Sequence, residues 1–337
     1  MSVDDYDYEL PEALIARHPV AQRDHSRLLA LPRAGERHEL RFSDIGRLLR
    51  AGDVLVVNDS RVLPARLRTR KSTGGQVELL CVERLLEGGW SAMAKGAKGL
   101  RPNMELWVEG EAAAIIVEAV HEGGFVRVRL PDAGFLQRCG ELPLPPYMGR
   151  GAEAEDQERY QTVYARAEGS VAAPTAGLHF TPELLFSLEG AGVELRRLTL
   201  HVGPGTFLPI KTDDPEKHRM HAERFMLPED TAAAVELAHR EGRRVVAVGT
   251  TSTRVLESFT GPLRAGPGST ELFIRPGHSW RHVDALVTNF HLPRSTLLML
   301  VCSFAGRDLV LSAYRAAVEA RFRFYSYGDA MFMERPV

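Results

Sequence analysis

Apolar residues follow two patterns along the chain, and the first is an alternation of buried strands and helices. Residues 52–59 contain a short apolar run that stops abruptly at Asn58 and Asp59, as a buried strand does at its carboxyl end. Thr181, Pro182 and Glu183 form a helix start, with Thr as the cap and Pro at the first helical position. The pattern then predicts helices near 181–190, 230–240, 295–304 and 308–322, and strands near 193–202, 243–248, 270–274 and 283–287.

The second pattern lies between residues 64 and 146, where short segments rich in Val, Leu and aromatic residues follow one another. These segments are 76–84, 90–94, 104–108, 113–120 and 125–130. Glycine pairs at 88–89 and 123–124 stand where hairpin turns would fall. No helical pattern interrupts them. We therefore expect a small all-β domain, in the form of a barrel, because closure removes exposed strand edges.

The two patterns together predict the fold class and the domain organisation. We expect an α/β protein whose layered main domain is built from both ends of the chain, residues 1–62 and 150–337. The barrel-like domain, residues 63–149, is inserted into it. The Pro- and Gly-rich residues 261–268 are interpreted as a surface loop.

The composition limits the cellular compartment in which the protein is expected and the cofactor chemistry that its cysteines could support. The 337 residues are 44% hydrophobic and 26% charged, as is ordinary for a soluble globular protein. The acidic N-terminal residues lack the pattern of a signal peptide, and the longest apolar run, 297–301, is too short to span a bilayer. Cys81, Cys139 and Cys302 are far apart and odd in number, which favours buried small hydrophobes over disulfides or zinc ligands. We expect a cytoplasmic protein with no membrane partner.

Charge gives a local signal only. The formal net charge of -2 is not that of a strongly basic nucleic-acid-binding domain. One basic cluster nevertheless stands out, composed of Arg61, Arg66, Arg68, Arg70 and Lys71. It could contact the phosphates of a nucleic acid, or it could be a solvated edge strand whose charges prevent aggregation.

Polar residues follow the predicted strands at the point where each strand ends. The strand ends are followed by residues 58–61, 203–206, 249–254 and 288–291. Because open α/β sheets bind ligands beyond the carboxyl ends of their strands, these four segments are expected to form one site. Residues 249–254 are rich in hydroxyl groups and suit an anionic group at a helix N-terminus, although Thr251 or Ser252 could simply cap that helix.

Several histidines allow both a functional and a structural interpretation. His218, His221 and Glu223 could bind a metal, act in acid–base chemistry, or lie on a solvated surface, and their spacing is not that of the helical His-Glu-x-x-His zinc motif. His179 and His201 could each be a satisfied core histidine. We expect no metal site.

Ten segments resemble one known family closely. They are residues 23–27 (Arg-Asp-His-Ser-Arg), 58–66, 142–147, 158–164, 172–180 (Ala-Ala-Pro-Thr-Ala-Gly-Leu-His-Phe), 200–207, 221–223 (His-Ala-Glu), 248–254 (Val-Gly-Thr-Thr-Ser-Thr-Arg), 288–296 (Thr-Asn-Phe-His-Leu-Pro-Arg-Ser-Thr) and 325–331. In this order they resemble the S-adenosylmethionine:tRNA ribosyltransferase-isomerases of queuosine biosynthesis. The resemblance covers essentially the whole chain.

The resemblance implies an unusual use of S-adenosylmethionine as a co-substrate, with no permanently bound cofactor. Its ribosyl part would be transferred to the aminomethyl-deazaguanine (prequeuosine) wobble base of a tRNA, giving epoxyqueuosine while adenine and methionine leave. The sulfonium acidifies the adjacent ribose C–H, so a base could form an ylide there before adenine departs and the substrate amine attacks. We expect a monomer that binds tRNA.

This chemistry needs a base, an acid, an anchor for the methionine carboxylate and contacts to the ribose. As catalytic candidates we name Glu223 or His221 as the base, and His179, His201 or His291 as the acid at adenine. The candidates for binding S-adenosylmethionine are Thr250, Thr251, Ser252 and Arg254 for the carboxylate, Asn289 and Asp59 for ribose hydroxyls, and Gly205. The basic cluster is expected to contact tRNA.

Two other functions remain as alternatives. A methyltransferase using S-adenosylmethionine would carry a Gly-rich turn after its first strand and an acidic ribose ligand about 20 residues on, which are not evident. An RNA-binding protein without activity would leave the polar strand ends unexplained, and the chain lacks the stacking aromatics of a sheet platform.

Overall fold

The computed structural model describes residues 2–33, 36–85, 87–203, 215, 218 and 220–336. Its main feature is a nine-stranded sheet in the order β15-β13-β12-β3-β14-β16-β17-β1-β2. The strands are β1 Arg27–Leu31, β2 His38–Arg41, β3 Val54–Asn58, β12 Glu194–Leu200, β13 Glu223–Leu227, β14 Val245–Val248, β15 Gly266–Thr270, β16 Ala285–Asn289 and β17 Ala330–Glu334. Strands β12, β3, β14 and β16 are parallel, and antiparallel strands extend the sheet beyond them.

Helices cover both faces of this sheet, which explains the continuous apolar runs of its central strands. The α-helices of the main domain are α2 Asp156–Arg159, α3 Pro182–Gly190, α4 Glu229–Arg240, α5 Gly249–Glu257, α6 Thr296–Ala305 and α7 Arg307–Glu319. Val54 and Val56 pack in a core with residues of α4 to α7, whereas Leu55 and Val57 pack with α3 and the short 3-10 helix Phe42–Arg47. The predicted layered α/β domain is confirmed.

The middle of the chain forms a closed six-stranded barrel, as predicted. Its strands are β5 Arg66–Lys71, β6 Gln76–Arg84, β7 Trp90–Lys95, β8 Glu105–Trp107, β9 Ile115–Val120 and β10 Phe125–Arg129, in the order β10-β7-β6-β5-β8-β9, and α1 (Phe135–Cys139) follows them. Gly88 and Gly89 form the turn between β6 and β7, and both have positive φ angles, which suits glycine. The edge-strand interpretation of the basic cluster is wrong, because β5 pairs with β6 and with β8.

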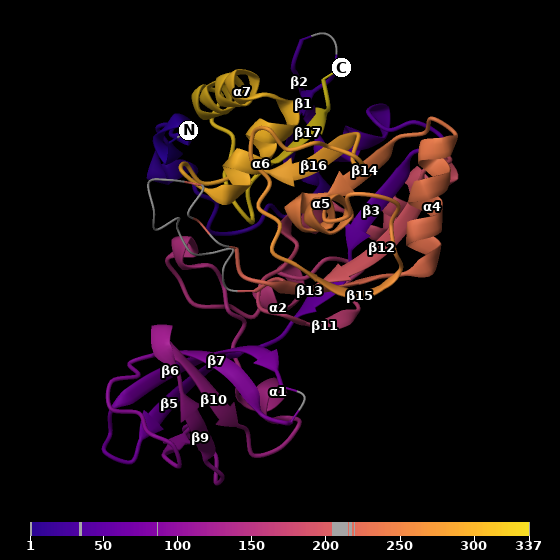
Figure 1. Cartoon of the computed structure of the whole chain (residues 1–337). Helices are drawn as coiled ribbons and strands as arrows, with labels where there is room; N and C mark the ends of the chain where they lie inside the picture. Colours follow the sequence, from indigo (N-terminus) through magenta and orange to yellow (C-terminus); the bar gives the residue numbers. More distant parts are fainter. Residues whose placement is uncertain are drawn as a thin grey trace.

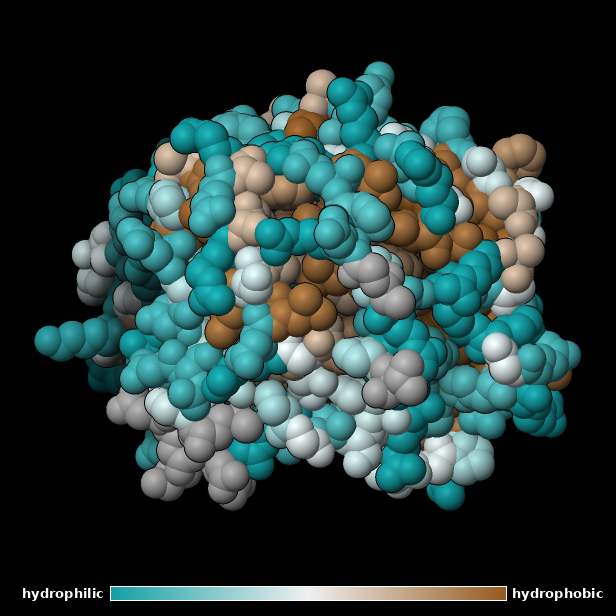
Figure 2. All heavy atoms as spheres, turned by 90° about the horizontal axis from the view of Figure 1, so that it is seen from above, coloured by the Kyte–Doolittle hydropathy of each residue, from teal (hydrophilic) through white to brown (hydrophobic). Residues whose placement is uncertain are grey.

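The barrel lies beside the end of the sheet where the parallel strands finish (Figure 1). The chain enters it through β4 (Ser60–Val62), which follows β3 and pairs with β11 (Ala167–Ser170). An ion pair of 3.2 Å between Arg224 of β13 and Glu83 of β6 also links the two parts. The side of the molecule away from the barrel shows mainly hydrophilic side chains, with apolar ones between them (Figure 2).

Other expectations need correction. The strand expected at 270–274 is instead β15, Gly266–Thr270, so residues 261–268 are not entirely a loop. This strand pairs with β13 alone, and an edge position tolerates the Gly and Pro that its sequence contains. Cys81 and Cys302 are buried as expected, whereas Cys139 is only half-buried. Among the described residues no single helix could cross a membrane, although α6 and α7, bent by 116°, meet the criteria of length and composition together.

Candidate active site

The carboxyl ends of the four parallel strands meet at one edge of the sheet, as the polar strand ends predicted. From β3 the chain goes to β12 on one side, and it later forms β14 on the other side of β3. Such a change of direction opens a crevice at the carboxyl ends of the strands, where α/β proteins bind ligands. Strand β17 is antiparallel to β16, so the segment before it also reaches this edge.

A cavity of about 450 Å³ lies at this edge. Its wall is formed by residues 172–176, 249–251, 288–297, 325 and 326, together with Val3, Tyr147 and Val202. About half of these residues are apolar, and the others carry hydroxyl, amide, imidazole or guanidinium groups. The Tyr147 hydroxyl and Ser326 Oγ, which lie 2.5 Å apart, join the segment leaving the barrel to the segment before β17. The cavity therefore combines apolar surface with several placed polar groups, as small-molecule sites do.

The N-terminus of α5 opens directly into this cavity. Gly249, with a φ of 83°, is the first residue of α5, and Val248 before it offers no side-chain cap. Thr251 Oγ1 and Ser252 Oγ lack a hydrogen-bond partner among the described residues. The capping interpretation of these hydroxyls is therefore wrong, since the helix begins before them. Unpaired N–H groups and a free hydroxyl at a helix N-terminus favour an anion.

Asn289, at the end of β16, is held by two hydrogen bonds from its side-chain nitrogen. Nδ2 donates to the carbonyl of Tyr325 at 3.1 Å and lies 3.0 Å from Nε2 of His179. The other ring nitrogen of His179, Nδ1, lies 2.7 Å from Ser26 Oγ. Burial, with Arg23 and Arg323 as further causes, lowers the pKa of His179 to about 3. The His179 ring is therefore neutral at pH 7.

His291 lines the cavity and is fixed at its backbone and its ring. Its N–H donates to the Tyr314 hydroxyl at 3.0 Å, and its carbonyl accepts from the Tyr8 hydroxyl at 2.5 Å. Its Nε2 lies 2.8 Å from Thr288 Oγ1. Burial lowers the pKa of His291 to about 3, so the ring is neutral at pH 7. Acting as an acid would require bound substrate to raise this pKa.

Glu223 and Arg254 form a buried ion pair, 6% and 5% exposed. Glu223 Oε1 also accepts from the N–H of Gly203 at 3.0 Å. The Arg254 guanidinium donates in addition to the carbonyls of Leu272, at 3.0 Å, and Thr270, at 3.5 Å. These contacts occupy the guanidinium, which the sequence suggested as a carboxylate anchor, with groups of the protein itself.

Comparison with known proteins finds related sequences over nearly the whole chain. The family model described as queuosine biosynthesis protein matches residues 3–333. The chain belongs to the queuosine biosynthesis protein family. An S-adenosylmethionine:tRNA ribosyltransferase-isomerase from Anaeromyxobacter sp. (strain Fw109-5) is 54% identical over 99% of both chains, and one from Syntrophotalea carbinolica is 53% identical over 99% of this chain and 100% of its own. The crystal structure of S-adenosylmethionine tRNA ribosyltransferase from Thermotoga maritima matches 98% of this chain and 99% of its own, with 37% identity and a TM-score of 0.57.

The structure brings only some of the predicted residues of this family member to the cavity. Thr250, Thr251, Asn289 and His291 line it. Seven other predicted residues do not belong to its wall. Five of them are buried, namely Ser252, Arg254, Asp59, Glu223 and His179, whereas His201 is half-buried and His221 is exposed. Gly205 lies outside the described residues. Asp59 accepts a hydrogen bond from Thr199 at 2.6 Å and pairs with Arg166 at 2.9 Å. The individual roles of these residues stay predictions.

The sequence interpretation gave no role to several residues of the wall. Tyr147, Thr288, Tyr325 and Ser326 line the cavity, and all four lie within segments that resemble the family. Ser26, which contacts His179, lies in another such segment. Those segments were the available signal, but residue type alone gave no reason to choose these side chains. Within the described ranges, no three His, Cys, Asp or Glu side chains gather as metal ligands would.

Thr251 offers a direct test of the cavity as a binding site. We expect Thr251→Val to weaken binding of S-adenosylmethionine about tenfold, because Val keeps the shape and removes a free hydroxyl, a loss of about 1.4 kcal/mol. Thr253→Val is the matched control, since the Thr253 hydroxyl bonds the Gly249 carbonyl at 3.0 Å inside the same helix. Isothermal titration calorimetry measures both. Equal affinities in the two variants would argue against Thr251 as a ligand contact.

Proposed function

We propose that this protein transfers and isomerises the ribosyl moiety of S-adenosylmethionine onto the prequeuosine wobble base of tRNA. Epoxyqueuosine-tRNA is the product, and adenine and methionine leave. The relatives match nearly the full chain with 54% and 53% sequence identity, and their names support this activity. No permanently bound cofactor is needed, because the sulfonium itself activates the ribose, and the enzyme acts as a monomer in the cytoplasm.

The observation that carries this proposal is that one cavity is lined both by an anion-attracting helix end and by Asn289, whose amide oxygen has no partner among the described residues. Gly249, Thr250 and Thr251 present the N-terminus of α5, which suits the methionine carboxylate. Asn289 Oδ1 suits a ribose hydroxyl. A cavity of about 450 Å³ is within the usual range for ligands of this size. The apolar wall would also keep water from reactive intermediates.

The proposal also assigns the residues that transfer protons. Glu223 or His221 is proposed as the base for the sulfonium-activated C–H, and His291 as the acid at adenine. His291 is the one imidazole of the three acid candidates that lines the cavity within the described residues. His201 is a weaker acid candidate because it does not line the cavity, and burial, with Arg224 as a second cause, lowers its pKa as burial does for His291.

One incubation tests the reaction. The protein is mixed with S-adenosylmethionine and tRNA carrying the prequeuosine base, and the small products are separated by chromatography. Adenine and methionine in equal amounts are expected. Adenosylhomocysteine would instead indicate methyl transfer, and tRNA binding without turnover would favour a protein that only binds RNA. Either of these two results would overturn the proposal.

The outer face of the barrel is proposed to position the tRNA. Arg66, Arg68 and Arg70 alternate with the buried Leu67 and Thr69 on β5, so they share this face. Arg68 makes a two-bond contact with Glu141, at 2.8 and 3.1 Å, which phosphate would have to replace. Arg61 of β4 is exposed, and Lys71 Nζ donates to the carbonyl of Lys98 at 2.6 Å. Among the described residues, the cluster therefore contains both unpaired and partly neutralised cations.

Replacing Arg68, Arg70 and Lys71 together by Ala is expected to weaken tRNA binding and to flatten its salt dependence. Each lost phosphate contact should reduce the slope of log K against log salt by about 1. Filter binding at several salt concentrations measures both quantities. A triple replacement of Arg127, Arg129 and Arg138, which pair with carboxylates elsewhere on the barrel, is the charge-matched control. Equal salt slopes in the two triple variants would remove the β5 face from the proposal.

A further inference from the structure

The amide of Asn289 can adopt only one orientation. A backbone carbonyl has lone pairs and no hydrogen, so it can only accept a hydrogen bond. The carbonyl of Tyr325 lies 3.1 Å from Asn289 Nδ2. Turning the amide over would place Oδ1 against this carbonyl, acceptor against acceptor. Tyr325 therefore fixes the nitrogen of Asn289 on the protein side of the site.

This orientation determines the tautomer of His179. Because Asn289 Nδ2 is a donor and lies 3.0 Å from His179 Nε2, that ring nitrogen must accept. The ring proton then sits on Nδ1 and is donated to Ser26 Oγ at 2.7 Å. The Ser26 hydroxyl in turn donates to the carbonyl of Arg23 at 3.4 Å. Every link from Tyr325 to Arg23 thus has a defined donor and acceptor.

The surroundings keep the His179 ring neutral and still. The side chain is 4% exposed and stacks on Phe42, with ring centroids 4.9 Å apart. A proton on Nε2 would face the amide hydrogens of Asn289. Burial and the two guanidiniums of Arg23 and Arg323 disfavour that proton and lower the pKa of His179 to about 3. Both ring nitrogens are occupied by protein partners, and the ring is not part of the cavity wall.

Asn289 is left with one unused group, and the residue that carries it lines the cavity. Oδ1 has no hydrogen-bond partner within the described part of the chain, although the residue is only 2% exposed and lines the cavity. A buried acceptor without a partner is unfavourable, because it has lost its hydrogen bonds to water. A ligand with an O–H or N–H donor at this point would recover that free energy. The amide therefore favours a donor group and rejects a second acceptor there.

We propose that His179 is a positioning residue, which holds Asn289 so that Oδ1 accepts a hydrogen bond from a ribose hydroxyl of S-adenosylmethionine. This deepens the proposed function and rests on it for the identity of the ligand. It replaces the acid role that the sequence allowed for His179 with a binding role exerted through Asn289. Ser26 completes the unit by fixing the ring from the other side.

The tautomer is tested first, because it does not depend on any reaction. Two-dimensional ¹H–¹⁵N spectra of protein labelled at histidine show which ring nitrogen carries the proton, and the signal absent from His179→Gln identifies His179. We expect the Nδ1–H form and no protonation between pH 5 and pH 8. An Nε2–H tautomer, or an imidazolium forming in this range, would overturn the proposal.

Binding and turnover then separate positioning from acid catalysis. His179→Leu and Asn289→Ala should each weaken S-adenosylmethionine binding about tenfold, and the double variant should be little weaker, because both act on one contact. His179→Gln should recover most of the loss in His179→Leu, since Gln can accept from Asn289 and donate to Ser26. Calorimetry measures these affinities whether or not turnover occurs.

Two results would contradict the positioning role. The first is additive losses in the double variant, which would show that the two side chains act separately. The second is a His179→Gln protein that binds S-adenosylmethionine normally but releases adenine about a hundredfold more slowly in a single turnover, as a missing acid would. If the wild type released no adenine, the proposed function would fail, and the tautomer and the affinities would still decide the role of His179.

Discussion

Glu223→Gln is expected to lower the free energy of unfolding by about 3–5 kcal/mol, because it leaves the Arg254 charge buried without its partner. Both side chains are nearly inaccessible, and Glu223 also accepts from the Gly203 N–H. Urea titration monitored by circular dichroism measures the loss. Glu141→Gln is the matched control, because its ion pair with Arg68 is largely exposed and should contribute little. A small loss in Glu223→Gln would show that the pair is not held as described.

The same substitution also tests Glu223 as the proposed base, if its effect on the rate of adenine release is separated from its effect on stability. Removing both charges in Glu223→Gln/Arg254→Met should restore most of the stability, because replacing a whole buried pair is often nearly neutral. If Glu223 removes the proton, adenine release in a single turnover should stay about a hundredfold slower in this stable double variant. Recovery of the rate together with the stability would assign Glu223 a structural role. If His221→Ala also released adenine at the wild-type rate, His221 would be excluded as the base.

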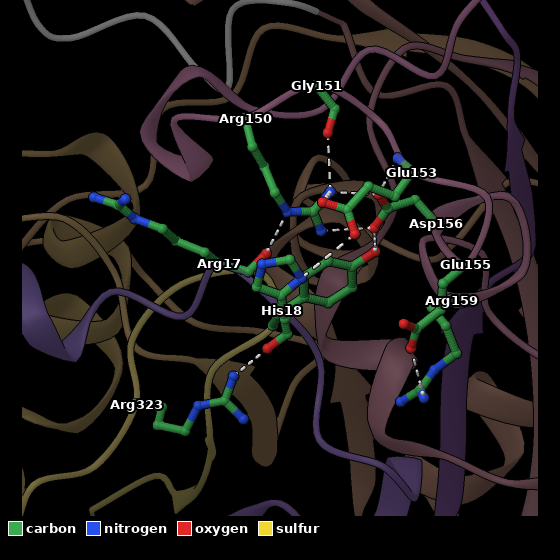
Figure 3. Close-up of polar contacts among 10 residues, drawn as sticks. Arg17, His18, Arg150, Gly151, Glu153, Glu155, Asp156, Arg159 and Arg323 are labelled. Carbon is green, nitrogen blue, oxygen red and sulfur yellow. Dashed lines mark hydrogen bonds and ion pairs between the residues drawn. The ribbon is translucent and has the colours of Figure 1, made fainter.

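Asp156→Asn is expected to cost about 3–5 kcal/mol of unfolding free energy as well, by breaking a second buried ion pair. The Asp156 side chain is 1% exposed and receives Arg150 through two bonds, at 2.6 and 2.9 Å (Figure 3). It also accepts from the Glu153 N–H at 2.8 Å and the Tyr327 hydroxyl at 2.7 Å. Asp132→Asn is the control, because its two-bond contact with Arg138 is exposed and should contribute little.

The pH dependence of this effect has a definite sign. Burial alone would raise the pKa of Asp156, but the hydrogen bonds from Arg150, Glu153 and Tyr327 outweigh it, and the pKa is lowered. A lowered pKa stabilises the fold above the unfolded value of about 3.9, and this contribution is lost as the pH falls through the folded value. The wild type and Asp156→Asn should therefore differ most at neutral pH and converge below about pH 4. A difference that grew on acidification would contradict this account.

The Asp156 cluster also connects stability to the site. Arg150 Nε donates to the carbonyl of Arg17 at 2.9 Å, and Arg323 donates to the carbonyl of His18 (Figure 3). These bonds tie the segment that leaves the barrel to the N-terminal segment and to the one before β17. Tyr147 and Ser326, which line the cavity and contact each other, lie on two of these segments. Loosening the cluster should therefore weaken S-adenosylmethionine binding in addition to stability.

Local patterns determined much of the architecture in advance. The unbroken apolar run at residues 54–57 predicted a strand buried on both faces, and the glycine pairs predicted the hairpins of the barrel. Thr181 caps α3 as its sequence indicated. These features depend on neighbouring residues, whose spacing along the chain is also their spacing in space. Strand β15 was misplaced because its Gly and Pro residues are tolerated only through its edge position beside β13.

The sequence by itself thus determined the two kinds of domain, the edge of the sheet that carries the cavity, and the family that the chain resembles. Only the tertiary structure decided which side chains line the cavity and what each one contacts. The fold places Glu223 against Arg254, the predicted carboxylate anchor, and it gives both ring nitrogens of His179, a predicted acid, partners within the protein. Hydrogen bonds between residues 31, 110 or 153 positions apart depend on strand order and register, which no local spacing records.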